Sequence, residues 1–254
     1  MPIGLLLVGT LAVGTKHVPL SALRVVQQAG DTPPIPTDAR RDPLGTPPPA
    51  PAGVGGYRFM AHLPGRPDVP VAYDPCRPIH VVVSNASAPP GADRLVREAI
   101  REVSRATGLV FIIDGATDEL PSNKRPVQDR RYGDRWSPVL VAWTTPAQDP
   151  RLRGRVAGIG GSAAGNGGGT GGPRFLTGAV SLDVPAISKI LARPDGHQQA
   201  RAIVMHELGH LVGLAHVPDP RELMYPKNSG QVTFGDGDLR GLHELGLGRC
   251  YFDT

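Results

Sequence analysis

Residues 206–216 read HELGHLVGLAH and form the most informative stretch of the sequence. On a helix, residues four apart lie on the same face, so His206 and His210 present their imidazoles one turn apart. Two imidazoles at this spacing can bind one Zn²⁺ at tetrahedral angles. Glu207 lies beside them, and its longer side chain can reach a metal-bound water without becoming a ligand. The stretch therefore predicts a helix that carries a zinc site.

Gly213 is the residue at which this helix is expected to end, because glycine adopts the left-handed conformation of helix termini without a steric penalty. A chain that turns at Gly213 brings His216 back as a third ligand. Three neutral imidazoles leave one tetrahedral position open for water, as catalytic zinc requires. The full pattern has a chance expectation on the order of 10⁻⁵ per chain of this composition. We therefore interpret it as a catalytic zinc site rather than a coincidence.

The remaining histidines show no comparable spacing. Each is interpreted as a surface residue or as a core residue with its hydrogen bonds satisfied: His17, His62, His80, His197 and His243.

A methionine follows eight residues after His216, within Leu-Met-Tyr-Pro at 223–226. The motif HExxHxxGxxH with such a turn resembles the metzincin zinc peptidases, and residues 206–226 are similar to the matrixin branch in particular. The resemblance implies that Met224 forms an apolar floor beneath the metal histidines and that Pro226 contributes to the wall of the S1′ pocket. It also implies one catalytic Zn²⁺ and peptide-bond hydrolysis, with Glu207 as the general base.

Some matrixin features are missing. Cys76 lies in Asp-Pro-Cys-Arg-Pro rather than in the matrixin latency motif, so a cysteine switch is not expected. Asn228 follows Pro226 and Lys227 where matrixins usually have a tyrosine, which leaves the subsite preference open. The glycine-rich stretch 158–172 has neither the carboxylates nor the histidines of the matrixin structural metal loops. A structural Ca²⁺ is therefore not supported by the sequence.

Apolar and β-branched runs predict five strands, of which the last two are weaker. Their expected positions are 79–85, 108–113, 139–143, 155–162 and 179–183. The fourth is expected to be an edge strand that pairs with an extended peptide around 156–162. The glycine-rich loop after it is interpreted as an unordered insertion, with gating of access as the alternative.

Three segments predict helices. Residues 92–107 have apolar side chains at helical spacing before Gly108, residues 198–212 follow Asp195 as a candidate N-cap, and a short helix is expected at about 238–245. The order of strands and helices predicts an α/β (α+β) domain with a mixed sheet. The resemblance implies a twisted five-stranded mixed sheet, an active-site helix, and a small C-terminal subdomain that contains the last helix.

The first 56 residues are expected to lie outside the domain. Residues 3–14 form an apolar run that is too short to span a bilayer but suits an export signal. No basic residue precedes this run, so a buried strand or a misassigned start codon are the alternatives. Residues 31–53 contain eight prolines and predict a semi-extended linker. The predicted organisation is a signal or membrane-anchor-like segment (1–16), a Pro-rich linker (17–56) and a matrixin-like peptidase domain (57–254).

Cys76 and Cys250 are the only cysteines. In an exported chain they can form a disulfide that closes a loop of 175 residues. The chain-entropy model assigns such a bridge a stabilisation of roughly 5 kcal/mol. The alternative is a pair of buried free thiols. The export signal and the bridge support each other, so we expect a secreted or cell-surface protein.

The charge pattern names no partner. The densest basic patch comprises Lys124, Arg125, Arg130, Arg131 and Arg135, interrupted by Asp129 and Asp134. Aromatic residues make up only 5% of the chain, so a solvated loop is favoured over a nucleic-acid site. No run of 18 apolar residues occurs, which excludes a multispanning membrane protein. We expect a monomer that binds a protein or peptide substrate, with no nucleic acid and no stable membrane domain beyond an N-terminal anchor.

Two rival functions are weighed against the endopeptidase. A non-catalytic, zinc-bound binding module on a metzincin scaffold has no need of Glu207, yet Glu207 is present. A peptidase for cell-wall cross-links is ranked lower because no appended wall-binding repeat is visible.

Overall fold

The computed structural model describes residues 32–169 and 171–252. The apolar run 3–14 and His17 lie outside the described residues, so the export signal stays a prediction. No described helix is long and apolar enough to cross a membrane.

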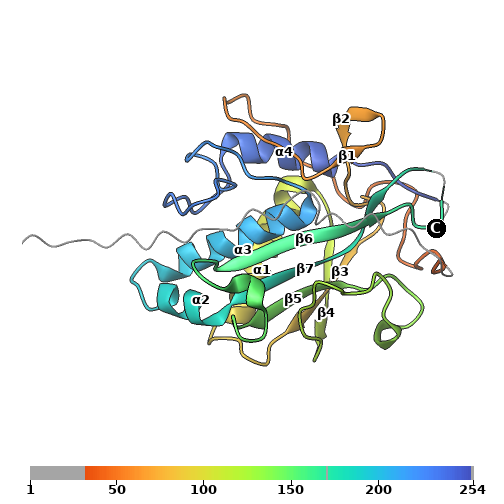
Figure 1. The fold of residues 1–254 in the computed structure, drawn as a ribbon. Coiled ribbons are helices and arrows are strands. Elements are labelled where there is room, and N and C mark those ends of the chain that lie inside the picture. Colours follow the sequence, from red (N-terminus) through yellow and green to blue (C-terminus); the bar gives the residue numbers. More distant parts are fainter. Residues whose placement is uncertain (1–31, 170, 253–254) are drawn as a thin grey trace, which may run out of the picture.

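A five-stranded mixed sheet forms the centre of the molecule (Figure 1). The strand order is β4-β3-β5-β7-β6, and only β6, at one edge, is antiparallel to its neighbour. The predicted mixed sheet and α/β class are therefore confirmed. The bounds are β3 (Ile79–Ser84), β4 (Phe111–Ala116), β5 (Val139–Thr144), β6 (Gly158–Gly165) and β7 (Arg174–Asp183).

Two of the predicted strands are displaced along the chain. The second predicted strand begins at Phe111 rather than at residue 108, because Gly108 has a φ of 71° and ends the preceding helix. The fourth runs to Gly165, so residues 163–165 belong to a hairpin with β7 and not to an unordered insertion. A strand made mostly of small residues shows no alternation of apolar and polar side chains, and this hid its true extent.

Helices pack on one face of the sheet (Figure 1). Alternate strand residues such as Val81, Val141 and Leu182 point into this core. Helix α1 (Ala92–Thr107) has the predicted bounds, whereas α3 (Gly196–Val212) and α4 (Asp236–Gly246) begin two residues earlier than predicted.

One helix and one hairpin were not predicted. Helix α2 (Val184–Leu191) is short and is capped by Asp183, whose carboxylate accepts a hydrogen bond from the amide of Ala186. A small hairpin pairs β1 (His62–Leu63) with β2 (Arg66–Pro70). Asp195 occupies the N-cap position of α3 as predicted, but its carboxylate caps no helix amide and instead accepts a hydrogen bond from the side chain of Gln199.

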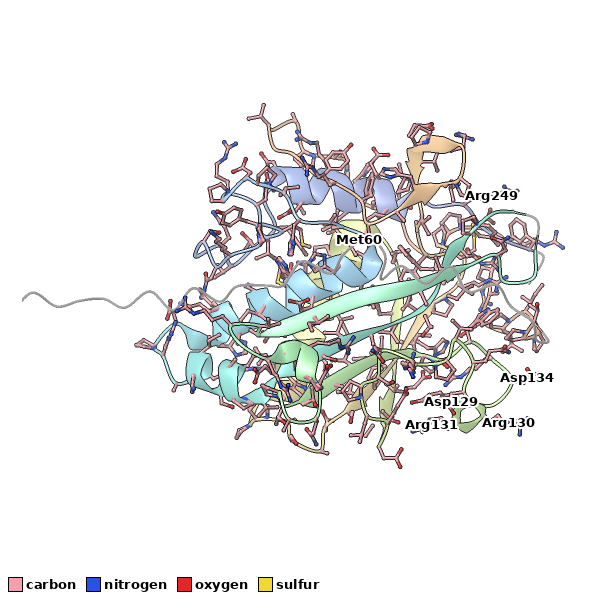
Figure 2. The ribbon with its side chains drawn as sticks, viewed as in Figure 1. Met60, Asp129, Arg130, Arg131, Asp134 and Arg249 are labelled. Atoms are coloured by element: carbon pink, nitrogen blue, oxygen red, sulfur yellow. A yellow bond between two sulfur atoms is a disulfide. The ribbon has the colours of Figure 1, made fainter. Side chains whose placement is uncertain are left out.

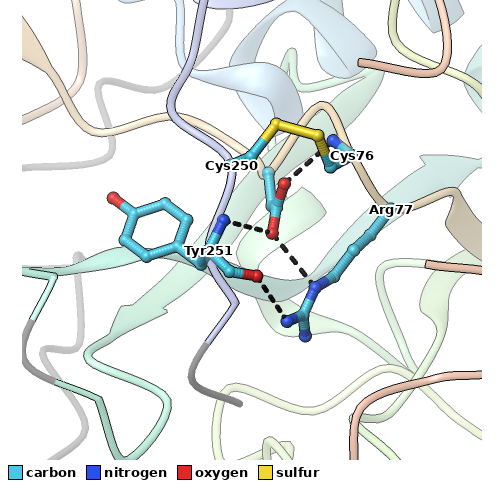
Figure 3. Close-up of a disulfide and its surroundings, with 5 residues drawn as sticks. Cys76, Arg77, Cys250 and Tyr251 are labelled. Atoms are coloured by element: carbon cyan, nitrogen blue, oxygen red, sulfur yellow. Dashed lines mark hydrogen bonds and ion pairs between the residues drawn. A yellow bond between two sulfur atoms is a disulfide. The ribbon is translucent and has the colours of Figure 1, made fainter. Parts of the chain in front are cut away.

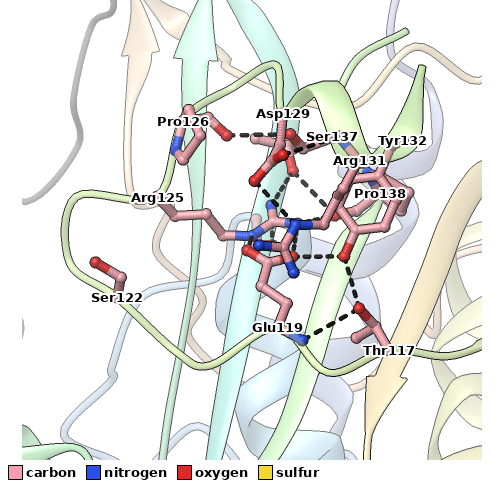
Figure 4. Close-up of polar contacts among 12 residues, drawn as sticks. Thr117, Glu119, Ser122, Arg125, Pro126, Asp129, Arg131, Tyr132, Ser137 and Pro138 are labelled. Atoms are coloured by element: carbon pink, nitrogen blue, oxygen red, sulfur yellow. Dashed lines mark hydrogen bonds and ion pairs between the residues drawn. The ribbon is translucent and has the colours of Figure 1, made fainter.

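The other face of the sheet is partly covered by the loop 117–138, where Tyr132 packs on a small cluster that contains Val82 and Leu140. Arg125 of this loop donates two hydrogen bonds to Glu119, at 2.7 and 3.1 Å, and both side chains are 7% exposed (Figure 4). The prediction of a solvated basic loop is therefore wrong for Arg125. Residues that fit the prediction lie on the outside of the loop (Figure 2), namely Arg130, Arg131 and Asp134.

Arg125 fastens the loop to the sheet. Its guanidinium also donates to the carbonyl of Pro138, at 2.7 Å, and to the hydroxyl of Thr177, at 2.8 Å. Removal of one member of a buried ion pair leaves an uncompensated charge and typically destabilises a protein by about 3–5 kcal/mol. The pair therefore holds the loop in place and is not available to a nucleic acid.

Residues 32–56 lie along the domain without regular secondary structure. The amides of Arg40 and Leu44 donate to the carbonyls of Cys76 and Pro75, at 2.8 and 2.9 Å. Further along, Arg240 of α4 donates to backbone carbonyls of this segment. The segment thus contacts the domain at several points, and the boundary at residue 57 stays a prediction.

A disulfide joins Cys76 to Cys250 (Figure 3). The buried carboxylate of Asp74 accepts hydrogen bonds from the amides of Cys76 and Tyr251, at 2.9 and 3.1 Å, and forms an ion pair with Arg77. The two ends of the domain are therefore tied together by covalent and polar contacts at one place.

Candidate metal centre

Helix α3 carries His206 and His210 on one face and ends at Gly213. Gly213 has a φ of 125°, and its amide donates to the carbonyls of Gly209 and His210. A Cβ at this position would lie 2.9 Å from a methyl group of Leu245. The turn after the helix therefore requires glycine for its backbone conformation and also for its packing.

The three imidazoles meet at one point. The Nε2 atom of His216 lies 3.1 Å from the Nε2 atoms of both His206 and His210. The Nδ1 atom of His206 donates to the carbonyl of Leu223, at 2.7 Å, and that of His210 donates to the carbonyl of Leu214, at 2.8 Å. With a proton on each of these Nδ1 atoms, the Nε2 lone pairs point toward one another. The structure thus brings together the three residues that the spacing predicted as ligands.

This arrangement fits a zinc ion. Tetrahedral Zn²⁺ with Zn–N bonds of about 2.0–2.1 Å separates its nitrogen ligands by roughly 3.3 Å, close to the observed 3.1 Å. With His206 and His210 protonated on Nδ1, their Nε2 lone pairs are available to a shared metal ion. Burial, followed by the nearby charge of His216, lowers the pKa of His206 to about 4, which favours the neutral form that binds metal.

Glu207 lies beside the histidines without joining them. Its side chain is buried, and it accepts a hydrogen bond from the amide of Gly160 on β6. The Oε1 atom has no hydrogen-bond partner among the described residues. Burial raises the pKa of Glu207 to about 8. A buried carboxylate oxygen without a protein partner is available to accept or donate a proton.

Glycines of β6 allow this strand to approach α3. A Cβ on Gly158 would lie 2.6 Å from Cγ of Glu207, and one on Gly160 would lie 2.0 Å from the carbonyl oxygen of Glu207. Any larger residue would push the strand away from the catalytic candidate. Sequence reasoning missed this role, although two glycines at the spacing of one strand face were a usable signal.

Met224 is buried beneath the helix, and its sulfur lies 2.7 Å from the position that a Cβ on Gly209 would occupy. It therefore packs against the helix at Gly209, and its role as a floor beneath the histidines stays a prediction.

Two buried carboxylates support the turn around Met224, and neither was predicted. Asp238 of α4 accepts from the amide of Leu223 at 2.5 Å, and Glu222 accepts from the amides of Gly237 and Asp238 at 3.0 and 2.9 Å. Burial, opposed by the hydrogen bond from Gly235, raises the pKa of Asp238 to about 7. Glu222 lies in a turn and Asp238 in the first turn of a helix, where acidic residues are common, so the sequence gave no signal of this role.

A pocket of about 60 Å³ opens beside His206 and Glu207. Pro226, predicted as a wall, is not among the residues that line it, whereas its neighbours Tyr225 and Lys227 are. The wall therefore has a different composition from the one that the resemblance implies.

The histidines outside the motif have ordinary partners. His80 lies between Asp38 and Asp114, His197 bonds to Glu98, and His243 bonds to a backbone carbonyl. The other described group of potential metal ligands, around Asp74, contains the two disulfide-bonded cysteines and is not a metal site.

Comparison with known proteins gives one family match over the region of the candidate metal centre. A family model described as Matrixin matches residues 141–245, less than half of the chain but including every predicted ligand, Glu207 and Met224. Matrilysin from Felis catus is 42% identical over 48 residues, which are 17% of this chain and 18% of matrilysin. The chain thus matches less than a fifth of the length of that curated relative.

A crystal structure of archaemetzincin from Methanopyrus kandleri overlaps 65% of this chain and 84% of that chain, at 16% sequence identity and a TM-score of 0.36. This likeness is too weak to support a statement about the site. The Matrixin match contains the three histidines, so residues 141–245 are similar to the matrixin family in the part of the chain that carries the candidate metal centre.

Proposed function

We propose that the chain is a zinc-dependent endopeptidase that hydrolyses peptide bonds of extracellular proteins or peptides. The observation that carries the proposal is the convergence of three Nε2 atoms next to a buried glutamate with an unpartnered oxygen. His206, His210 and His216 hold one Zn²⁺. When bound, this ion supplies a Lewis acid that polarises a carbonyl and lowers the pKa of water.

Glu207 moves the protons. Its buried carboxylate accepts a proton from the attacking water and then donates it to the leaving amine. Burial makes it a stronger base than a solvated glutamate, and a cation held by the three imidazoles favours its charged form. The amide of Gly160 orients the carboxyl group through one hydrogen bond, which leaves Oε1 for the water.

The edge strand β6 supports a binding mode for an extended peptide. Its outer side has no strand partner among the described residues, and Gly158 and Gly160 place it directly beside Glu207. A peptide that adds itself to this edge is therefore positioned by backbone hydrogen bonds while its scissile bond faces Glu207.

Location and assembly complete the proposal. A disulfide persists in oxidising compartments, which supports secretion or exposure at the cell surface. The enzyme acts as a monomer on protein or peptide substrates and binds no nucleic acid. Arg125 of the basic loop supports this, because it is buried in an ion pair with Glu119.

The test is a peptide-library digest by the purified full chain, read by mass spectrometry, with and without chelator. The wild type should cleave, the chelator should stop cleavage, and added zinc should restore it. Glu207→Gln at matched zinc occupancy should keep its metal and fold but lose about 10²–10⁴-fold in turnover. A wild type that binds zinc and peptides without cutting them would establish the non-catalytic binding module instead.

A further inference from the structure

The pocket beside Glu207 has two chemically different parts. Its inner wall is apolar and consists of Ala157, Ala202, Ile203 and Leu223, of which only Ile203 is not fully buried. Its outer part is polar and consists of Gln199, Lys227, Asn228, Ser229 and Gln231, together with the ring of Tyr225. The pocket therefore offers both an apolar wall and hydrogen-bonding groups to a side chain that enters it.

Lys227 supplies the charge at the outer end. Its side chain is exposed, and no described residue forms an ion pair or a hydrogen bond with its ammonium group. Asp219, an acidic residue earlier in the same loop, is already paired with Arg221 at 2.7 Å. The ammonium group is therefore available to a ligand.

Two exposed arginines lie close in the sequence to one wall of the pocket. Arg153 and Arg155 precede the lining residue Ala157 by four and two positions and are exposed. Neither forms an ion pair with a described residue, whereas Arg151 does so with Asp149. Glu207 is the acidic group in the lining, and the three imidazoles beside it are the binding place of a dication. Lys227 and a dication at the imidazoles favour an anionic group in the pocket, whereas Glu207 and Asp195, which accepts a hydrogen bond from the lining residue Gln199, oppose it.

We infer that this pocket selects substrates in which a residue flanking the cleaved bond has an apolar stem and a terminal carboxylate, as glutamate does. This inference rests on the proposed function of the same site. The methylene groups pack on the apolar wall, and the carboxylate reaches Lys227 at the polar end. Because Lys227 is exposed, the ion pair is screened by solvent, and the expected preference for glutamate over glutamine is on the order of three- to tenfold.

The test compares peptides that differ at one position flanking the cleaved bond, with Glu, Gln, Leu or Lys there. The zinc-loaded wild type should show the highest kcat/KM for the Glu peptide, and added salt should reduce the advantage. Lys227→Glu should reverse the order and prefer the Lys peptide. Lys124→Glu makes the same change of charge in the loop on the opposite face of the sheet and should leave the wild-type order unchanged.

Binding affinities of the same peptides for Glu207→Gln separate this inference from the proposed function. If affinities follow the charge of residue 227 but no variant cleaves, the pocket assignment stands and the peptidase assignment fails. The inference is overturned while the peptidase assignment stands in either of two cases. In the first, the wild type cleaves and Lys227→Glu ranks the peptides by kcat/KM in the same order. In the second, both proteins prefer the Leu peptide.

Discussion

Two carbonyl oxygens orient two of the three histidines, and the molecule holds these carbonyls in different ways. The carbonyl of Leu214 accepts from His210, and that of Leu223 accepts from His206. The first lies in a turn that is paired with another backbone segment. The second lies in a turn that is held by a side-chain carboxylate.

The turn at Leu214 is held by residues 58–60, which form a short antiparallel contact with residues 213–215. The amide of Met60 donates to the carbonyl of Gly213 at 2.8 Å, and the amide of Ala215 donates to the carbonyl of Arg58 at the same distance. Backbone amides and carbonyls do not titrate, so this support does not depend on pH.

The turn at Leu223 is held by Asp238, which accepts from the amides of Leu223, Met224 and Gly235. This carboxyl group is buried, and its pKa is raised to about 7. The comparison shows that His210, one proposed metal ligand, has a support independent of pH, whereas His206 depends on a group that titrates near neutrality.

Loss of a proposed metal ligand is expected to weaken zinc binding most. The effects of losing either support are compared with it. His206→Ala and His210→Ala should each weaken zinc binding by more than the roughly 10–100-fold that follows loss of an outer-shell partner. Zinc content after dialysis against a chelator, measured on folded protein, checks this. Retention of stoichiometric zinc by either variant contradicts the ligand set.

The ligand helix was predictable because its information is local. His206, His210 and Gly213 lie within one segment, and the helical repeat alone places them relative to one another. The strands at Val81 and Val141 were predictable for a similar reason, since continuous apolar runs mark buried parallel strands.

The two supports could not be predicted because they arise from contacts between distant segments. Nothing near Met60 in the sequence indicates that its amide meets Gly213, more than 150 residues later. Asp238 resembles any acidic residue in the first turn of a helix until its burial is known. Arg125 was misjudged for the same reason, because its partner Thr177 lies on a distant strand.

Loss of the carboxylate support at Asp238 is expected to have the next largest effect on zinc binding. Asp238→Ala leaves the amides of Leu223 and Met224 without their acceptor, so the carbonyl that orients His206 is no longer fixed. We expect zinc affinity to fall by about 10–100-fold, measured by competition with a chromophoric chelator. Glu244→Ala, on the exposed side of the same helix, is the control and should bind zinc like the wild type.

A smaller effect is expected at the backbone support. Met60→Pro removes one amide donor to Gly213, whereas Met60→Ala keeps it. The proline variant should release zinc up to about tenfold faster than the alanine variant, at the low end of outer-shell effects. Equal release rates would mean that the contact of residues 58–60 does not position His216 or His210.

The smallest effect separates the supports by their response to pH. The pKa of Asp238 is raised from 3.8 to about 7 on folding, so the folded state binds a proton that the unfolded state releases. Its contribution to stability is therefore fully present below pH 3.8 and is lost as pH rises through 7. Asp238→Asn, which cannot ionise, should lose less unfolding free energy than the wild type between pH 6 and pH 8, by on the order of 1 kcal/mol.

Urea unfolding of the metal-free, disulfide-intact protein at these two pH values measures this difference. Glu207 also has a raised pKa, but it is present in the wild type and in Asp238→Asn, so its contribution cancels in the comparison. Met60→Ala should show the wild-type dependence on pH, because the support that it borders contains no titrating group. If Asp238→Asn instead follows the wild type, the hydrogen bonds from Leu223, Met224 and Gly235 keep Asp238 ionised in the folded protein. Both supports would then be insensitive to pH, and the contrast between them would disappear.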